Sequence, residues 1–218
     1  MKKKLLGGVL APLGLAVLVT AGMAAQGQWR AFYANDPVGR NVVVIESHAP
    51  LETMVTTTNQ VVGEIKLNPD NVLDDPQARF ELDTASLDTG IPLRNEHLRG
   101  EAWLETDKYP KAVFTLTRFD PVRRIGRVSL RDGAKLENAR AEGTLELHGV
   151  KRRITARISA NFIAASEQTA ARLKGDLLHV RAEFPVKLDD FGIKVDKAAQ
   201  LKVANEQQVR VDIFTSTG

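Results

Sequence analysis

The feature that most constrains the fold of this chain is an alternation of apolar and polar residues along residues 153–162. Ile154, Ala156, Ile158, Ala160 and Phe162 are apolar, and the residues between them are arginine, threonine, serine or asparagine. Successive side chains of a β-strand point to opposite faces, whereas a helix of this sequence would carry charges on every side. The segment therefore predicts a long strand with one face in a core and the other in water.

The same two-residue period recurs through most of the chain from residue 41 onward. Helix-forming stretches are confined to residues 95–105 and 164–174, and short turns separate most of the alternating segments. Many alternating strands with few helices are typical of an antiparallel sandwich or barrel. The further candidate strands are 41–46, 51–58, 61–67, 78–83, 112–119, 141–148, 178–188 and 209–213.

The apolar faces of these strands combine small residues with large ones. In a sandwich, large residues of the opposing sheet must fill the space beside each small residue, because protein cores are densely packed. In a closed barrel of about eight strands, small residues can instead leave a lumen for one small ligand. The residues alone leave both architectures open. The small inward positions are Gly63, Ala78, Ala112, Ala156, Ala160 and Ala182.

The first 25 residues differ in composition from the rest of the chain. Lysines at positions 2–4 account for the whole formal net charge of +3, and residues 5–25 are uncharged and end in small residues. This pattern is typical of a secretory signal peptide, with an uncleaved N-terminal membrane anchor as the alternative. Both predict a domain outside the cytoplasm. Residues 26–40 are interpreted as a linker or as a segment that packs late on the domain, and residues 41–218 as the folded domain.

The composition argues against several classes of function. Without the three N-terminal lysines the chain is neutral, and only 6% of its residues are aromatic, so nucleic acid is not an expected partner. The sequence has no cysteine, and its four histidines are isolated from one another, so no metal site is expected. A phosphate-binding loop, a dinucleotide fingerprint and a nucleophile elbow are also absent from the sequence, which predicts no cofactor.

Four short motifs are the most distinctive part of the sequence. They are Ser-Leu-Asp-Thr-Gly at 86–90, Arg-Asn-Glu-His-Leu at 94–98, Leu-Glu-Leu-His-Gly-Val at 145–150 and Asp-Phe-Gly at 190–192. In the sequences of these motifs, residues 40–215 closely resemble the YceI-like family of bacterial envelope proteins. The second motif departs from the family's Arg-Asp-x-His-Leu pattern, because Asn95 stands where an aspartate is usual.

The resemblance implies an all-β fold: a closed antiparallel lipocalin-like barrel of about eight strands, with one or two short helices in loops. It implies a binding protein and not an enzyme, exported to the periplasm or the extracellular face of a bacterial envelope. Its ligand would be an isoprenoid-type lipid, such as a polyprenyl chain or a quinone, sequestered or carried in the lumen. Transient membrane contact is compatible with this function, and nothing in the sequence indicates an oligomer.

The resemblance and the strand pattern together give a set of expected site residues. Arg94 and His97 are expected at the barrel mouth, where they order a loop and contact a ligand headgroup, or act only as a loop staple. His148 is expected to be structural. The lumen is expected to be lined by Phe80, Leu82, Phe114, Leu116, Ile154, Ile158, Phe162, Val180, Phe184, Val211 and Ile213.

Two other functions fit the same sequence. The first is a lipid-modifying enzyme, such as a hydrolase or isomerase, with His97 as an acid or base at the mouth. The second is a barrel with a solid core that acts through its outer surface with a protein partner. A bulky residue placed at Ala156 separates a hollow barrel from a solid one, because overpacking destabilises a filled core.

Overall fold

A computed structural model describes residues 29–121, 128–131 and 135–218. The segment expected to be a signal peptide or anchor, residues 1–25, lies outside this range. No helix within the described ranges is both long and apolar enough to span a bilayer. The strands are β1 (Arg30–Ala34), β2 (Val42–His48), β3 (Thr53–Thr58), β4 (Val61–Leu67), β5 (Gln77–Asp83), β6 (Lys111–Asp120), β7 (Lys135–Leu147), β8 (Val150–Ile163), β9 (Leu177–Lys187) and β10 (Glu206–Ser216).

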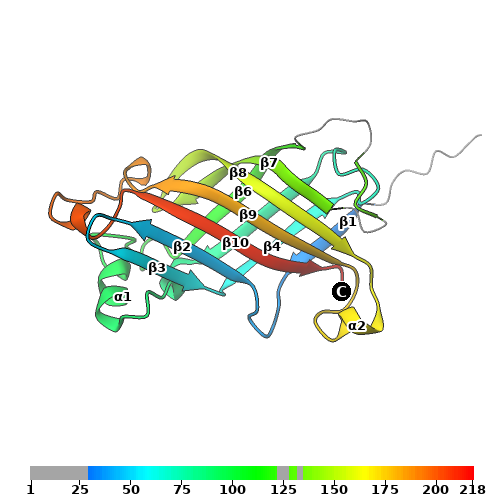
Figure 1. Cartoon of the computed structure of the whole chain (residues 1–218), viewed down its shortest axis with the longest axis horizontal. Helices are drawn as coiled ribbons and strands as arrows, with labels where there is room; N and C mark the ends of the chain where they lie inside the picture. The colour runs from blue at the N-terminus through cyan, green and yellow to red at the C-terminus, as the bar shows by residue number, and fades with distance from the viewer. Residues whose placement is uncertain (1–28, 122–127, 132–134) are drawn as a thin grey trace, which may run out of the picture.

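Eight of these strands close a barrel (Figure 1). Their order round the ring is β1-β4-β5-β6-β7-β8-β9-β10, and β10 returns to β1 through the pair Tyr33 and Ser216. Every pairing is antiparallel, and most connections join neighbouring strands, as expected for an up-and-down barrel. The closed antiparallel barrel expected from the sequence is confirmed.

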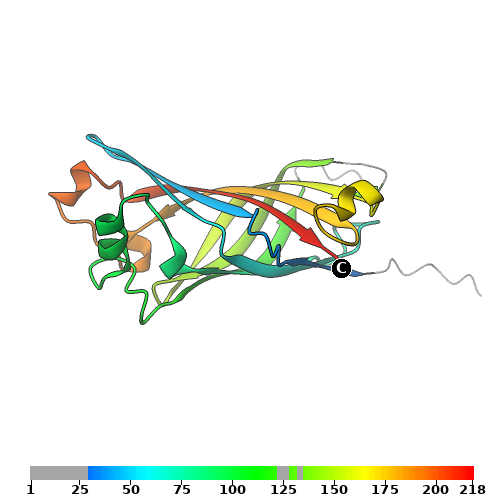
Figure 2. The same ribbon diagram turned by 90° about the horizontal axis from the view of Figure 1, so that it is seen from below.

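The remaining two strands form a hairpin that extends the sheet beyond the ring. β2 pairs with the first half of β10, and β3 pairs with β2. In Figure 2 this hairpin separates from the strands opposite it at the end of the barrel that carries α1 (Pro92–Arg99). One bridge between Thr57 and Asp88 ties β3 to the loop before α1. The β2–β3 hairpin and α1 therefore lie on opposite sides of this end of the barrel.

The first strand corrects the interpretation of residues 26–40 as a linker. Residues Arg30–Ala34 pair with β4 over the whole length of β1, and the side chain of Phe32 is fully buried. Arg30 also forms an ion pair with Asp176, next to the start of β9. This part of the predicted linker is therefore a structural strand of the barrel.

The short helices lie in loops, as expected. The second, α2 (Glu167–Ala170), begins at Ser166, whose hydroxyl accepts a hydrogen bond from the Thr169 amide. Between β7 and β8, His148 and Gly149 form a two-residue turn with φ values of 52° and 71°. Positive φ at both central residues is typical of a type I′ hairpin turn, which matches the twist of the flanking strands.

The barrel interior is not uniform along its length. At the end opposite α1, Phe32 and Phe162 meet edge to face, with ring centroids 6.3 Å apart. Val72, Leu130 and Leu178 are buried in the same hydrophobic cluster. This end of the barrel is a densely packed core, and it is called the closed end below.

Candidate functional site

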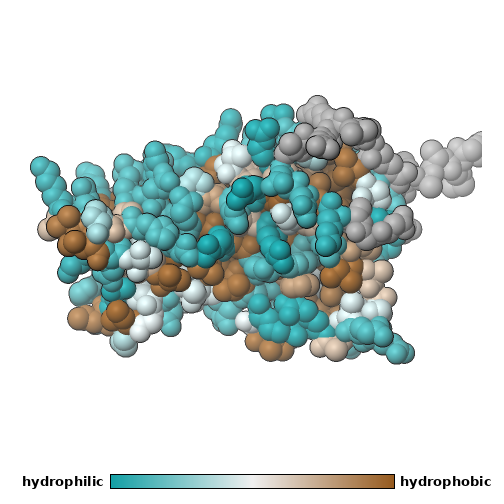
Figure 3. Space-filling model, in the orientation of Figure 1, coloured by the Kyte–Doolittle hydropathy of each residue, from teal (hydrophilic) through white to brown (hydrophobic). Residues whose placement is uncertain are grey.

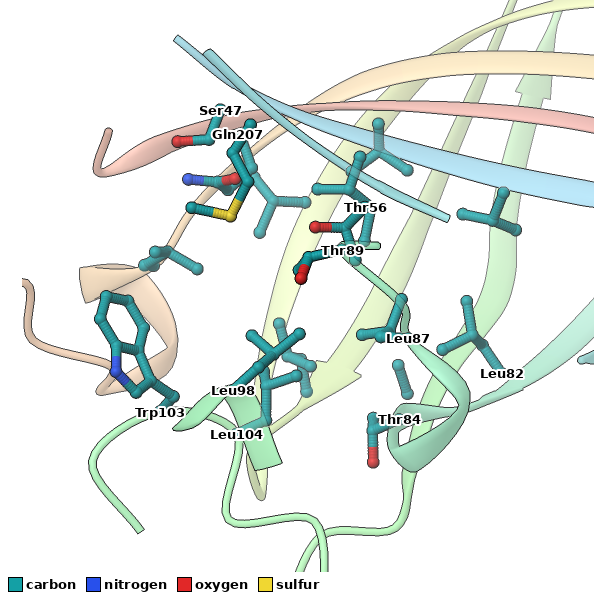
Figure 4. Close-up of a pocket in the computed structure, with 18 of the residues that line it drawn as sticks. Ser47, Thr56, Leu82, Thr84, Leu87, Thr89, Leu98, Trp103, Leu104 and Gln207 are labelled. Atoms are coloured by element: carbon teal, nitrogen blue, oxygen red, sulfur yellow. The ribbon is translucent and has the colours of Figure 1, made fainter. Parts of the chain in front are cut away.

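The other half of the barrel contains an elongated cavity of about 630 Å³. Its walls are the inward-facing residues of the strands, and its opening is framed by α1, the β2–β3 turn and the turn η4 (Ala199–Leu201). This opening is called the mouth below. Figure 4 shows Leu82 and Leu87 on one side of the cavity and Trp103 nearer the mouth. A volume of this size suits one small or medium-sized organic ligand.

Most of the residues expected in the lumen line this cavity. On most strands the lining residues are spaced two apart, as inward-facing positions of a strand are, and Glu81 between Phe80 and Leu82 is the exception. Small residues expected to leave space, Ala112, Ala156 and Ala182, are also in the wall. The expected residues found there are Phe80, Leu82, Phe114, Ile158, Val180, Phe184, Val211 and Ile213.

Three expected residues do not line the cavity. Phe162 belongs to the closed end, where it packs on Phe32. Leu116 and Ile154 are the two cross-strand neighbours of Gly143, and a Cβ atom at Gly143 would collide with the ring of Phe114. The Phe114 ring therefore lies over Gly143 and forms the wall there, in place of Leu116 and Ile154.

A bulge changes the facing of the last part of β6. The register shifts between Leu116 and Arg118, so that Phe119 packs into the core. Arg118 is exposed and lies near Asp120 and Glu142. Sequence parity places Arg118 on the inward face with Leu116, and the structure corrects this.

The residues near the mouth are the part of the site that the strand pattern does not reveal. They come from the segments before and after α1, from α1 itself, and from residues 188–203. Leu87, Leu104, Leu188 and Ile193 form a second buried cluster, with Leu98, Trp103 and Val203 packed against it. All seven of these side chains line the cavity. The mouth is therefore built on an apolar layer of loops.

Few of the described residues that line the cavity are charged, and most of these lie at the mouth. Arg94 on α1 donates to Glu52 in the β2–β3 turn, with Nη2 and Oε1 2.5 Å apart. His97 and Lys202 also line the cavity, and His97 is exposed. The Arg94–Glu52 pair joins the two sides of the mouth and so provides the loop staple considered for Arg94.

Asn95 fastens α1 to the preceding turn. Its Oδ1 accepts from the amide and the hydroxyl of Thr89, at 2.8 and 2.7 Å, and its Nδ2 donates to Asp88 at 2.6 Å. The amide of Asn95 holds the pKa of Asp88 below its ordinary value of 3.8, and the Gly90 amide adds to this effect. An aspartate at position 95 has no such donor, so asparagine matches the Asp88 carboxylate directly.

We predict that Asn95→Asp destabilises the mouth in a pH-dependent way. Two carboxylates would then face each other, which raises the pKa of Asp88. The melting temperature should fall by a few degrees at neutral pH, and the deficit should shrink as the pH approaches about 4. Thermal unfolding monitored across this pH range measures the effect.

The wild-type protein and Asn95→Ala serve as controls for this change. Because the pKa of Asp88 is lowered on folding, its contribution to wild-type stability is present above the unfolded value and is lost as the pH falls through the folded value. Asn95→Ala removes the hydrogen bonds without adding a charge. An equal deficit for Asn95→Asp and Asn95→Ala at every pH would contradict the repulsion argument.

His148 has a structural position outside the cavity wall. Its Nδ1 lies 3.1 Å from the carbonyl oxygen of Phe191, and its ring packs on Tyr109 with centroids 4.6 Å apart. Phe191 is buried in the turn η3 (Asp189–Phe191), which follows β9. His148 therefore connects the β7–β8 turn to the loops that support the mouth.

The mouth offers mainly apolar contacts together with a few charged side chains. The described residues contain no group of three histidine, cysteine, aspartate or glutamate side chains that could hold a metal ion. General acid–base catalysis requires a side chain held in position by a partner. Around His97 the described lining is mostly apolar, with Arg94 already paired to Glu52.

Comparison with known proteins agrees with this architecture. A model of the YceI-like domain matches residues 33–215. The chain is 30% identical over 198 residues to Protein YceI of Shigella flexneri, and 28% identical to that of Salmonella newport, with 90% of each chain covered.

Solved structures show the same fold at lower identity. BcnA of Burkholderia cenocepacia has a TM-score of 0.63 and 17% identity, covering 83% of this chain and 99% of its own. A polyisoprenoid-binding domain from Saccharophagus degradans has a TM-score of 0.59 and 16% identity, covering 88% of this chain and 100% of its own. With the family model spanning nearly the whole described barrel, the chain belongs to the YceI-like family.

Proposed function

We propose that this protein is an exported carrier or sequestering protein for an isoprenoid-type lipid, such as a polyprenyl chain or a quinone. The observation that carries the proposal is the apolar cavity of about 630 Å³, closed at one end and open at the other. A narrow apolar cavity of this kind suits a hydrocarbon tail better than a sugar or nucleotide. The polyisoprenoid-binding domain with the same fold supports this ligand class.

The energetics suit a carrier that exchanges lipid with a membrane. Moving a methylene group from water into the cavity is favourable by about 0.8 kcal/mol, but a tail that leaves a bilayer gains almost none of this. The cavity therefore needs to be only about as apolar as the bilayer interior. Selectivity then depends on the shape of the tail and on the few polar groups at the mouth.

Lipid extraction followed by mass spectrometry of the purified protein tests this function. The proposal expects a co-purified isoprenoid lipid, and uptake of polyprenol from vesicles by protein that has been stripped of lipid. His97→Ala should change affinity modestly, because binding is distributed over the apolar wall. An empty extract together with no uptake would contradict the proposal, and product formation lost in His97→Ala would favour an enzyme.

Export is part of the proposal and rests on the N-terminal segment. Its basic start, apolar stretch and small residues are the features of a secretory signal. The location that follows is the periplasm or the extracellular face of the envelope, with the segment cleaved or kept as an anchor. Fractionation of cells that produce the full chain, followed by N-terminal mass analysis, distinguishes these locations and forms.

We also propose that the mouth makes transient contact with the membrane. Leu51, Ile91, Leu93 and Leu201 are exposed and surround the opening, with Leu51 and Leu93 70% and 61% exposed. The Leu51 amide donates to the Leu201 carbonyl, which brings the β2–β3 turn against η4. Figure 3 shows apolar groups at this end of the molecule. Exposed apolar residues at the opening of an apolar cavity suit insertion into the bilayer interface.

We predict that serine at positions 51, 93 and 201 together slows lipid transfer from vesicles at least tenfold. The three leucines would no longer lower the cost of reaching a tail inside the bilayer, since each buried leucine side chain is worth about 1.5–3 kcal/mol. Uptake of the same lipid from detergent micelles should change little, because Leu51 and Leu201 lie outside the cavity wall and Leu93 lines it only at the mouth. Stopped-flow transfer of a fluorescent polyprenol between vesicles measures the rate.

A matched variant with serine at positions 38 and 62 controls for loss of surface hydrophobicity. Val38 and Val62 are also exposed apolar residues, but neither lines the cavity or its mouth. This control should transfer lipid at the wild-type rate. Equal slowing in both variants, or no slowing in the triple variant, would rule out the mouth as the membrane contact.

A further inference from the structure

Beyond the residues that line the cavity, Phe32 and Phe162 meet across the barrel interior, and this pair is called the floor below. Phe32 projects from β1 and Phe162 from β8, and the two rings meet at an interplanar angle of 86°. Round the ring of strands, β9 and β10 separate β8 from β1 on one side, and β4 to β7 on the other. The contact therefore crosses the interior. Neither ring is part of the cavity wall.

The space behind this floor is filled. Leu178, the cross-strand partner of Phe162, is buried in the same cluster as the two rings. Val72 and Leu130 are buried as well, and the Val72 amide donates to the Val128 carbonyl beside them. Densely packed interiors do not yield to an extra group without strain. A tail that reaches the floor has no space to continue.

One strand connects the cavity wall to the floor. On the inward face of β8, Ala156 and Ile158 line the cavity, and Ala160 and Phe162 follow on the same face. Ala160 contributes only a methyl group. Removing the ring of Phe162 would therefore open space next to the existing cavity and not an isolated void.

We propose that Phe162, together with Phe32, sets the longest isoprenoid tail that this protein accepts. The proposal rests on the proposed lipid-binding function and deepens it, because it adds selection by chain length at the far end of the same cavity. A tail longer than the cavity must leave its excess methylenes at the mouth. A methylene left in water there adds nothing to the affinity measured from water and costs about fourfold relative to a tail held in a bilayer, so affinity stops rising or falls beyond the limit.

A series of polyprenols that differ by one isoprene unit tests this proposal. For the wild-type protein, affinity should rise with length up to a limit and then stop rising or fall. For Phe162→Ala the limit should move to longer tails by at least one isoprene unit, with affinity for short tails unchanged or slightly lower. Competition against a fluorescent polyprenol, with bound lipid identified by native mass spectrometry, gives the limit.

Two further variants make the result decisive. Phe162→Leu preserves most of the packing and should give a smaller shift of the same sign, should Phe162→Ala fail to fold. Phe214→Ala removes a ring of the same size that stacks outside the cavity on His179, 4.0 Å away, and should leave the limit unchanged. An unchanged limit in folded Phe162→Ala and Phe162→Leu would overturn this inference alone. A wild-type protein that binds no polyprenol of any length would overturn the proposed function and this inference with it.

Discussion

Replacing Ala156 with tryptophan is expected to abolish lipid uptake while leaving the barrel folded. Ala156 lies on β8 in the cavity wall, and its methyl group faces the open space. An indole placed there would occupy the path of the tail, and the cavity has room for it. Binding should weaken by at least a hundredfold, and the melting temperature should stay within a few degrees of the wild-type value.

The matched control for this change is tryptophan at Ala160. Ala160 lies four residues further along the same face of β8, but it belongs to the packed cluster near the closed end and not to the cavity wall. Overpacking a filled core costs about 1–3 kcal/mol or more, so Ala160→Trp should unfold at a clearly lower temperature. Calorimetry and a polyprenol-binding assay on both variants make the comparison. If Ala156→Trp unfolded and Ala160→Trp were unaffected, the space beside Ala156 would be filled and the space beside Ala160 would be hollow, which is the opposite of what is proposed.

The second large effect is expected at Gly143, opposite Phe114. A Cβ atom at Gly143 would collide with the Phe114 ring and would lie 2.7 Å from the Thr115 carbonyl oxygen. Gly143→Ala must therefore push the ring toward the cavity or strain the sheet, at a cost of about 1–3 kcal/mol. A displaced ring also narrows the cavity, so polyprenol affinity should fall together with stability. Chemical denaturation and a binding titration measure the two losses.

A double variant separates the ring from the backbone contribution. Phe114→Leu removes the ring that the new methyl group meets, so Gly143→Ala in that background should cost less than it does alone. The coupling energy from this double-mutant cycle should be about 0.5–3 kcal/mol, as for residues in direct contact. The destabilisation that Gly143→Ala still causes in the Phe114→Leu background measures the contact with the Thr115 carbonyl. Strict additivity would mean that the ring does not rest on Gly143.

The strands of the barrel could be predicted from the sequence because their two faces differ in polarity. β8 and β9 alternate cleanly, so their extent and inward residues follow from period alone. β1 could not be predicted in this way, because Phe32 faces inward and its neighbour Tyr33 faces outward, and both are aromatic. A strand of five residues without polar contrast looks the same as a linker.

The cavity itself was only partly predictable, because alternation gives the face of a residue but not its depth along the barrel. Phe162 has the same parity as Ile158 but lies deeper in the barrel, beyond the residues that line the cavity. The bulge after Leu116 reverses parity within β6 and leaves no signal in the composition. Loop residues such as Trp103 are brought to the mouth by tertiary packing. The two-residue period of the strands does not predict the positions of loop residues. Arg94 and His97 were placed at the mouth by their motif, and the structure has them in its lining.

If the proposed N-terminal segment is kept as an anchor, the position of β1 sets the orientation of the barrel. β1 begins at the closed end, where Arg30 pairs with Asp176, so the preceding residues join the molecule on the side away from the mouth. A retained N-terminal anchor would thus hold the closed end of the barrel next to the membrane in which the anchor is inserted. The mouth would then face away from that membrane. A protein released by cleavage of this segment could instead rotate freely, so that its mouth could contact any membrane surface within the same compartment. Under the proposed export and carrier function, retention or cleavage of this segment therefore distinguishes a carrier held in one orientation from one that diffuses.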